Sequence, residues 1–111
     1  MERDKLLHDL IVDRLRDKFS GGYRDIEVNA GGSPDMVIGN HGLTLAVVEV
    51  ETERSITDQK AEGWKDMLNS GSKLILVVPR SAKVRVMERL WKLGIADRVG
   101  VGSYEIVINM P

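Results

Sequence analysis

The sequence predicts an α/β domain in which helices flank a mixed central sheet. Three observations lead to this fold class: a helical spacing of leucines near the N-terminus, a strand-rich stretch with short turns, and alternating helix and strand signals in the second half. Together they predict the order helix, three strands, helix, strand, helix, strand. The chain has 111 residues, and we expect all of them, residues 1–111, to form one domain.

The first predicted element is a helix over about residues 3–19. Its apolar residues recur every four positions, and a neighbouring pair lies beside them: Leu7, Ile11, Leu15 and Phe19, with Leu6 and Leu10. The sequence Ser20-Gly21-Gly22 ends it.

Three strands follow this helix. Residues 25–29 alternate as a strand does, and a second strand is expected over 34–39, where a proline is tolerated at the start. The residues Asn40-His41-Gly42 favour a tight turn. The third strand, 43–51, is apolar at both parities, so we expect it to be central and covered on both faces.

The second half alternates between helix and strand. A helix over about 56–69 is predicted, with either Ser55 or Thr57 as its N-cap. A buried strand over 73–78 follows. The last two elements are a helix from Ser81, its predicted cap, to Leu93, and a strand over 104–109.

Composition narrows the classes of function. Hydrophobic residues make up 42% of the chain and charged residues 30%, which is typical of a folded domain. No apolar run reaches membrane-spanning length and the N-terminus is too charged for a secretory signal, so we expect no membrane partner. Because the chain has no cysteine and only two histidines, thiolate and histidine-rich metal sites are excluded, and a cytoplasmic location is expected.

Charge is distributed unevenly. Residues 73–98 hold seven basic and two acidic side chains, whereas the first 72 residues hold nine basic and fourteen acidic ones. A basic segment beside an acidic half fits a polyanion such as DNA, although an ordinary solvated helix face fits as well. The candidate phosphate contacts are Arg80, Lys83, Arg85 and Arg89.

Three carboxylates are expected to meet at one end of the sheet. A turn centred near His41 and Gly42 makes paired residue numbers sum to about 84, which sets Asp35 opposite Glu49. Glu51 shares the face of Glu49 because side chains alternate along a strand. Like charges opposite each other destabilise a hairpin, and oxygen ligands suit Mg²⁺ or Mn²⁺, so these residues are a candidate metal site.

A lysine on the second predicted helix is the next candidate. The apolar face of this helix is formed by Thr57, Ala61, Trp64 and Leu68. Lys60 lies on the same side, where its ammonium group either extends to solvent or reaches the carboxylates. Trp64 and Trp91 both lie on apolar helix faces and are expected in the core or in a dimer interface.

The order of elements and the residues Pro34-Asp35 and Glu49-Val50-Glu51 resemble the PD-(D/E)XK nuclease superfamily, which includes restriction endonucleases and Holliday-junction resolvases. The resemblance implies a restriction-endonuclease-like αβββαβ core with an additional C-terminal helix and strand. It also implies Mg²⁺- or Mn²⁺-dependent hydrolysis of DNA by an endonuclease or exonuclease. Because a chain of this size covers little of a duplex, we further expect a two-fold homodimer. Asp35, Glu49 and the carbonyl of Val50 would bind the metal, with a further acidic ligand from the first helix, for which Glu2 and then Asp13 are candidates.

Position 51 departs from the family pattern, which has lysine there. Three explanations stay open: Glu51 takes over the role of lysine in an E-x-E variant, Lys60 supplies the migrated lysine, or cleavage has been lost. The alternative functions are therefore a catalytically inactive nucleic-acid-binding module and a homodimeric interaction module on the same fold.

Overall fold

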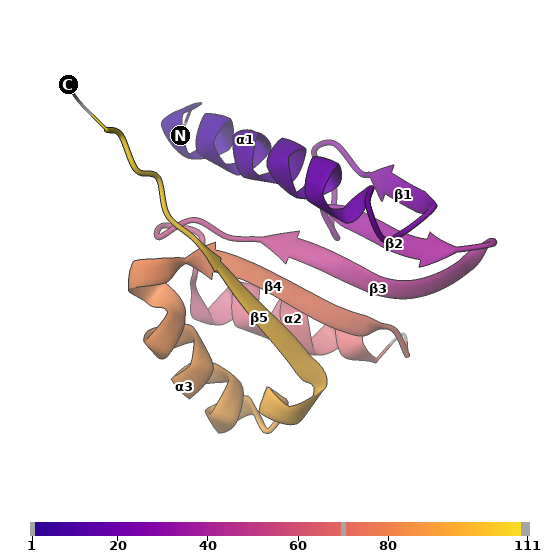
Figure 1. Cartoon of the computed structure of the whole chain (residues 1–111). Helices are drawn as coiled ribbons and strands as arrows, with labels where there is room; N and C mark the ends of the chain where they lie inside the picture. The colour runs from indigo at the N-terminus through magenta and orange to yellow at the C-terminus, as the bar shows by residue number, and fades with distance from the viewer. Residues whose placement is uncertain (1, 70, 110–111) are drawn as a thin grey trace.

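A five-stranded mixed sheet forms the centre of the computed structural model, which describes residues 2–69 and 71–109, with only the backbone of Glu2 (Figure 1). The helices are α1 (Glu2–Phe19), α2 (Asp58–Leu68) and α3 (Lys83–Leu93). The strands are β1 (Asp25–Val28), β2 (Met36–Asn40), β3 (Leu43–Val50), β4 (Lys73–Pro79) and β5 (Val99–Tyr104). Short 3₁₀ turns at Arg80–Ala82 and Ala96–Arg98 precede α3 and β5. The predicted α/β class and element order are confirmed.

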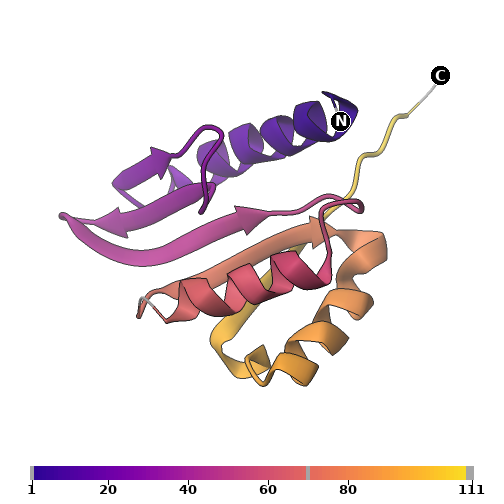
Figure 2. The same ribbon diagram turned by 180° about the vertical axis from the view of Figure 1, so that it is seen from behind.

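The strands lie side by side in the order β1-β2-β3-β4-β5. The first three are antiparallel, and β3, β4 and β5 are parallel to one another. Helix α1 covers one face, whereas α2 and α3 cover the other (Figures 1 and 2). None of the helices in the described part of the chain is long and apolar enough to cross a membrane.

Each face of the sheet has its own apolar core. On the α1 side, Ile11 and Val12 pack with Met36, Val48 and other strand residues. On the other side, Trp64, which is fully buried, packs with residues of β3, β4 and α3. Side chains of β3 pack into both cores, so the end of this strand lies between the two helix layers. The candidate site residues are located at this end.

The turn between β2 and β3 sets the register of the hairpin. His41 and Gly42 have φ values of 55° and 79°, as a tight two-residue hairpin turn requires. A bulge next to Gly39 adds one residue to β3, so that Met36 pairs with Val48 and residue numbers sum to 84, as predicted. A Cβ atom on Gly39 would lie 2.1 Å from the carbonyl oxygen of Leu43, so only glycine fits the bulge.

Several predicted boundaries and environments are wrong. The first three residues of β3 are exposed, because the helices cover only the second part of this strand. Thr57, one of the two predicted caps, does cap α2, whereas Ser81 does not cap α3 but donates a hydrogen bond to Glu53. Trp91 lies outside the core, with 73% of its surface exposed, so the core location is wrong for this residue and the dimer interface stays a prediction. Leu6 and Leu10 are also exposed, because they lie on the side of α1 that faces away from the sheet.

The final strand spans residues 99–104 rather than 104–109. Each residue of β5 pairs with β4, ending with Tyr104 opposite Pro79. Since β4 ends at this proline, the strand-favouring residues 105–109 have no neighbouring strand to pair with in the described part of the chain.

We predict that Gly39→Ala lowers the free energy of unfolding by about 2–3 kcal/mol, because the methyl group would overlap backbone that cannot move without breaking the hairpin. Gly63→Ala is the matched control: it lies within α2, where a Cβ meets nothing within 4 Å, and should raise stability by about 0.5–1 kcal/mol. Urea denaturation measures both, and equal stability of the two variants would show that the bulge tolerates a side chain.

Candidate active site

Asp35 and Glu49 lie together at the end of the β2–β3 hairpin. The N–H of Asp35 donates to Glu49 Oε1 at 3.0 Å, and the N–H of Val50 donates to Asp35 Oδ2 at 2.8 Å. Both side chains are buried, with 8% of Asp35 and 1% of Glu49 exposed. The hairpin register therefore brings together the two carboxylates that the sequence sets opposite each other.

Burial and neighbouring groups shift the pKa values of the two carboxyl groups in opposite directions. Burial, together with the negative charge of Asp35, raises the pKa of Glu49 to about 7. Burial also acts to raise the pKa of Asp35, but hydrogen bonds from His8 and from the Val50 N–H outweigh it and hold that pKa below its usual value. Near neutral pH, Asp35 is therefore ionised, whereas Glu49 is partly protonated.

Lys60 reaches the carboxylates from the first turn of α2. Its Nζ lies 3.5 Å from Glu49 Oε2 and 3.8 Å from Glu51 Oε1. Burial lowers the pKa of Lys60, but the charges of Glu51 and Glu49 outweigh it and raise that pKa, so the side chain stays an ammonium ion. A hollow of about 230 Å³ opens beside it, lined by Ser33, Glu49, Thr57, Gln59, Lys60, Gly63 and Met67.

Glu51 is directed at α2 rather than at Asp35. Its Oε2 accepts a hydrogen bond of 2.7 Å from the indole Nε1 of Trp64, and its Oε1 accepts one of 2.7 Å from Ser55. The side chain is fully buried, and this burial raises its pKa even though both hydrogen bonds favour the charged form. Glu51 therefore anchors α2 to the end of β3. Of the three predicted carboxylates, Asp35 and Glu49 form a pair, and Glu51 is held apart by its contacts with α2 and the loop before it.

His8 is a site residue that the sequence reasoning missed. From α1, its Nε2 lies 2.9 Å from Asp35 Oδ1, and its Nδ1 lies 3.0 Å from Asp9 Oδ1. The hydrogen bond with Asp35 is the main reason that the pKa of His8 rises to about 9, which makes the ring a cation at neutral pH. The available signal was its helical position, since His8 precedes the buried Ile11 by three residues.

The remaining predicted metal ligands are less well placed. Asp13 is exposed and lies about 140° around α1 from His8. The side chain of Glu2 lies outside the described residues. Val50 is buried and contacts Asp35 through its N–H. Among the side chains that the structure describes, residues 3–69 and 71–109, no group of three histidine, aspartate or glutamate residues is arranged to hold a metal ion.

Three of the four predicted phosphate contacts form ion pairs within the chain. Arg80 lies 3.0 Å from Glu105 and Arg85 lies 2.8 Å from Glu53, while Arg89 pairs with Asp58. All three pairs are at least partly exposed, where such contacts contribute little and exchange readily. Lys83 is exposed at the first turn of α3.

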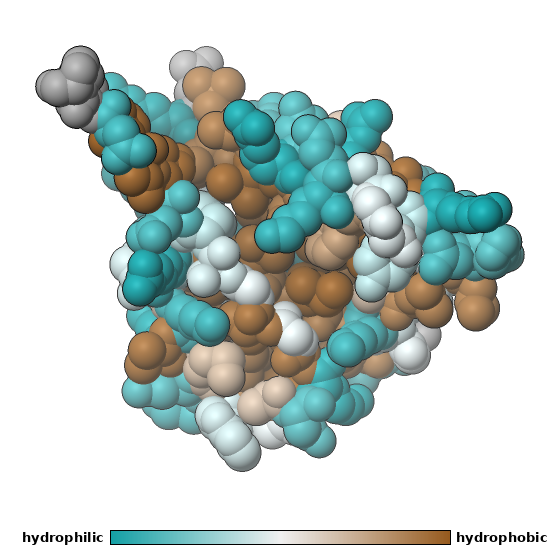
Figure 3. Space-filling model, viewed as in Figure 1, coloured by the Kyte–Doolittle hydropathy of each residue, from teal (hydrophilic) through white to brown (hydrophobic). Residues whose placement is uncertain are grey.

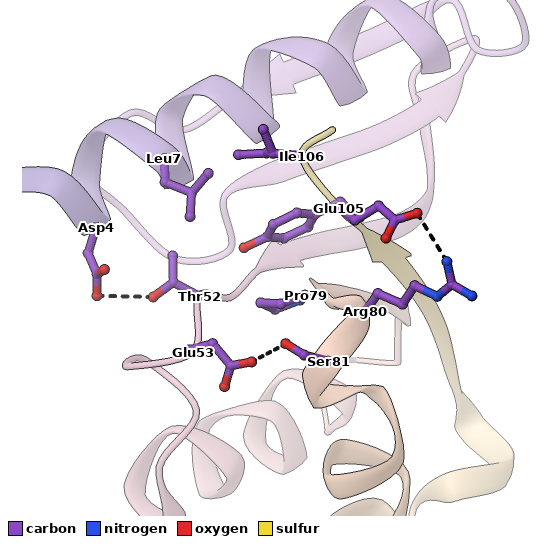
Figure 4. A pocket seen from close by; sticks show the side chains of 10 residues that line it. Asp4, Leu7, Thr52, Glu53, Pro79, Arg80, Ser81, Glu105 and Ile106 are labelled. Carbon is purple, nitrogen blue, oxygen red and sulfur yellow. Dashed lines mark hydrogen bonds and ion pairs between the residues drawn. The ribbon is translucent and has the colours of Figure 1, made fainter. Parts of the chain in front are cut away.

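A second hollow, of about 630 Å³, lies near the carboxyl ends of β4 and β5 (Figure 4). Asp4 and Thr52 close it on one side through a hydrogen bond of 3.2 Å. Leu7 and Ile106 contribute apolar side chains from α1 and from the segment after β5. None of Asp35, Glu49, Glu51 and Lys60 lines this hollow, so it is separate from the candidate active site.

Comparison of the chain with models of protein families, with curated proteins and with solved structures found no match. The family resemblance therefore depends on the motif residues and on the order of elements.

We predict that Glu51→Lys, which introduces the residue usual in the family that the motif resembles, lowers the free energy of unfolding by about 3–5 kcal/mol. The new ammonium group would be buried against the N–H of Trp64 and beside the ammonium group of Lys60. The indole N–H of Trp64 would also lose the carboxylate oxygen that accepts its hydrogen bond. Glu51→Gln keeps one acceptor oxygen and should cost about 1–2 kcal/mol. Urea denaturation measures both, and a Glu51→Lys variant as stable as the wild type would contradict the anchoring role.

We also predict that Glu49→Gln stabilises the chain at pH 8 but not at pH 4. The pKa of Glu49 is raised from 4.5 to about 7 on folding, so the wild type loses stability as the pH rises through this interval, and the loss is complete above pH 7. The amide carries no charge to repel Asp35, and the gain should be about 1–3 kcal/mol. Urea denaturation with a chelator present tests this, and a variant less stable than the wild type at pH 8 would refute it.

Proposed function

We propose that this chain is a metal-dependent nuclease domain of the PD-(D/E)XK type, with a restriction-endonuclease-like core, that hydrolyses DNA phosphodiester bonds. The observation that carries the proposal is the juxtaposition of Asp35, Glu49 and Lys60 at the end of one hairpin, beside a hollow that opens to solvent. Two buried carboxylates can hold a metal ion, and a charged lysine can offset the negative charge that develops on a phosphate during hydrolysis.

The donor atoms fit Mg²⁺ or Mn²⁺. Asp35 and Glu49 offer oxygen ligands only, and their mutual repulsion, which contributes to the raised pKa of Glu49, is what a cation would relieve. Two carboxylates without a third suit Mg²⁺, which keeps several water ligands in proteins. The carbonyl of Val50 would be a further oxygen ligand, as the resemblance implies. When bound, the ion would polarise the scissile phosphate and lower the pKa of a coordinated water.

Lys60 takes the role that the family gives to the lysine of its motif. Its ammonium group is held charged by Glu49 and Glu51, so it acts as a hydrogen-bond donor that orients the attacking water and offsets negative charge on the phosphate. Glu51 is not available to activate water, because both of its oxygens accept hydrogen bonds and the side chain is fully buried. Among the three explanations for Glu51, these contacts support the migrated lysine.

His8 contributes a second cation to the site. The protonated ring bonds to Asp35 Oδ1, an oxygen that a metal ion would also use. A cation bound to the same carboxylate would repel the protonated ring, so metal binding would favour movement or deprotonation of His8.

The competing function is a catalytically inactive nucleic-acid-binding or interaction module. The contact that favours it is the same ion pair between His8 and Asp35, which neutralises a metal ligand from within the chain. In this alternative the chain binds DNA weakly through Lys83 and the arginines of α3, and neither Mg²⁺ nor Mn²⁺ binds at the two carboxylates.

We predict Mn²⁺- or Mg²⁺-dependent cleavage of branched or linear DNA, abolished by Asp35→Asn and lowered about 10²- to 10⁴-fold by Lys60→Ala. Lys65→Ala is the matched control, since this exposed lysine lies on the same helix and should be dispensable. Calorimetry should detect Mn²⁺ binding to the wild type and to Lys60→Ala but not to Asp35→Asn. Cleavage that persists in Asp35→Asn would overturn the nuclease assignment, and a wild type that neither cleaves DNA nor binds Mn²⁺ would favour the inactive module.

A further inference from the structure

The outer edge of the sheet at β5 is open. Within the described part of the chain, this strand pairs only with β4, and it contains neither a proline nor a charged residue of the kind that blocks sheet edges. Residues 105–109, which we call the arm, continue the chain beyond it. Ile106, Val107 and Ile108 of the arm are 59%, 67% and 77% exposed. In the space-filling view, apolar side chains lie along this arm and across the middle of the same face of the molecule (Figure 3).

Side-chain size follows a pattern along one face of this edge. Gly100 and Gly102 lie before Tyr104, and Ile106 and Ile108 follow it at the same parity. The glycines lie on the side of β4 that carries Ile75 and Val77, because a Cβ built on them would be 3.9 Å and 3.8 Å from those side chains. Two small positions are thus followed, across a central tyrosine, by two large ones.

This pattern is complementary to itself when it is reversed about Tyr104. We propose that two copies of the chain pair antiparallel along residues 99–109, about a two-fold axis that passes through Tyr104. Gly100 then lies opposite Ile108 of the second copy, and Gly102 lies opposite Ile106. Each isoleucine then packs over the bare backbone of the glycine opposite it, and the large and small positions fit together across the pair.

The other face of the edge is compatible with the same register. Val101 lies opposite Val107, which joins two apolar side chains. Glu105 lies opposite Ser103 and not opposite its own copy, so no like charges meet. A two-fold axis normal to the sheet keeps the two faces of each copy aligned, and the two five-stranded sheets become one continuous sheet.

The dimer would place two candidate active sites near the symmetry axis. The hydroxyl of Tyr104 donates a hydrogen bond of 2.8 Å to the carbonyl oxygen of Glu51, so the centre of the pairing lies beside the end of β3. The pairing itself depends on the edge and the arm alone and is independent of whether the sites cleave DNA.

The mass of the full chain in solution tests the proposal. Sedimentation equilibrium should give twice the 12.4 kDa mass of one chain for the wild type and a single-chain mass for Ile106→Asp. Val84→Asp is the matched control, because Val84 is a similarly exposed apolar residue, 72% accessible, on α3. It should leave the dimer intact, and circular dichroism should show the native fold for both variants.

The register is tested by cross-linking, since the chain has no cysteine of its own. The variant carrying Ser103→Cys and Glu105→Cys should form a disulfide-linked dimer on oxidation, because residues 103 and 105 of the two copies lie opposite each other. Ser103→Cys alone should not cross-link, because residue 103 of the second copy lies diagonally across the strands, too far for a disulfide. The proposal is overturned if the wild type is monomeric from micromolar to millimolar concentration, if Ile106→Asp stays dimeric, if Val84→Asp dissociates, or if the double-cysteine variant does not cross-link.

Discussion

The buried carboxylate of Glu51 is the contact on which the arrangement of the candidate site depends. A carboxylate withdrawn from water is unfavourable unless its oxygens are hydrogen-bonded, and here both oxygens are, at 2.7 Å from Trp64 and at 2.7 Å from Ser55. These two contacts join the end of β3 to the middle of α2 and to the loop before it. Lys60 lies one helical turn before Trp64, so its position over Glu49 follows from this anchor. The residue that departs from the family pattern thus orients the helix that carries the lysine.

Two cations from different layers balance the paired carboxylates. Lys60 approaches Glu49 from α2, and His8 approaches Asp35 from α1 on the opposite face of the sheet. The end of the hairpin lies between the helix layers, so Asp35 contacts His8 of α1 and Glu49 contacts Lys60 of α2. A metal ion at this position would compete with His8 for Asp35, and the strength of that competition separates an active site from a silent one.

The sequence predicts those features that depend on local chemistry. The glycine turn sets the register that brings Asp35 to Glu49, and helical periodicity turns Lys60 toward the sheet. Features that depend on the relative placement of elements were missed. His8 meets Asp35 because α1 crosses that end of the sheet, and the partner of Glu51 depends on the depth at which Trp64 is packed. The final strand was misplaced because strand preference at 105–109 is local, whereas the available partner, β4, ends at Pro79.

The central claim is that Asp35 and Glu49 form the metal-binding pair while Glu51 serves as an anchor. Anomalous diffraction from a crystal soaked in Mn²⁺ tests this most directly, because it locates the ion without reference to activity. We expect an Mn²⁺ peak between the carboxylates of Asp35 and Glu49, with Lys60 beside it and Glu51 still hydrogen-bonded to Trp64. An ion coordinated by Glu51, or no peak at the two carboxylates under saturating Mn²⁺, would contradict it.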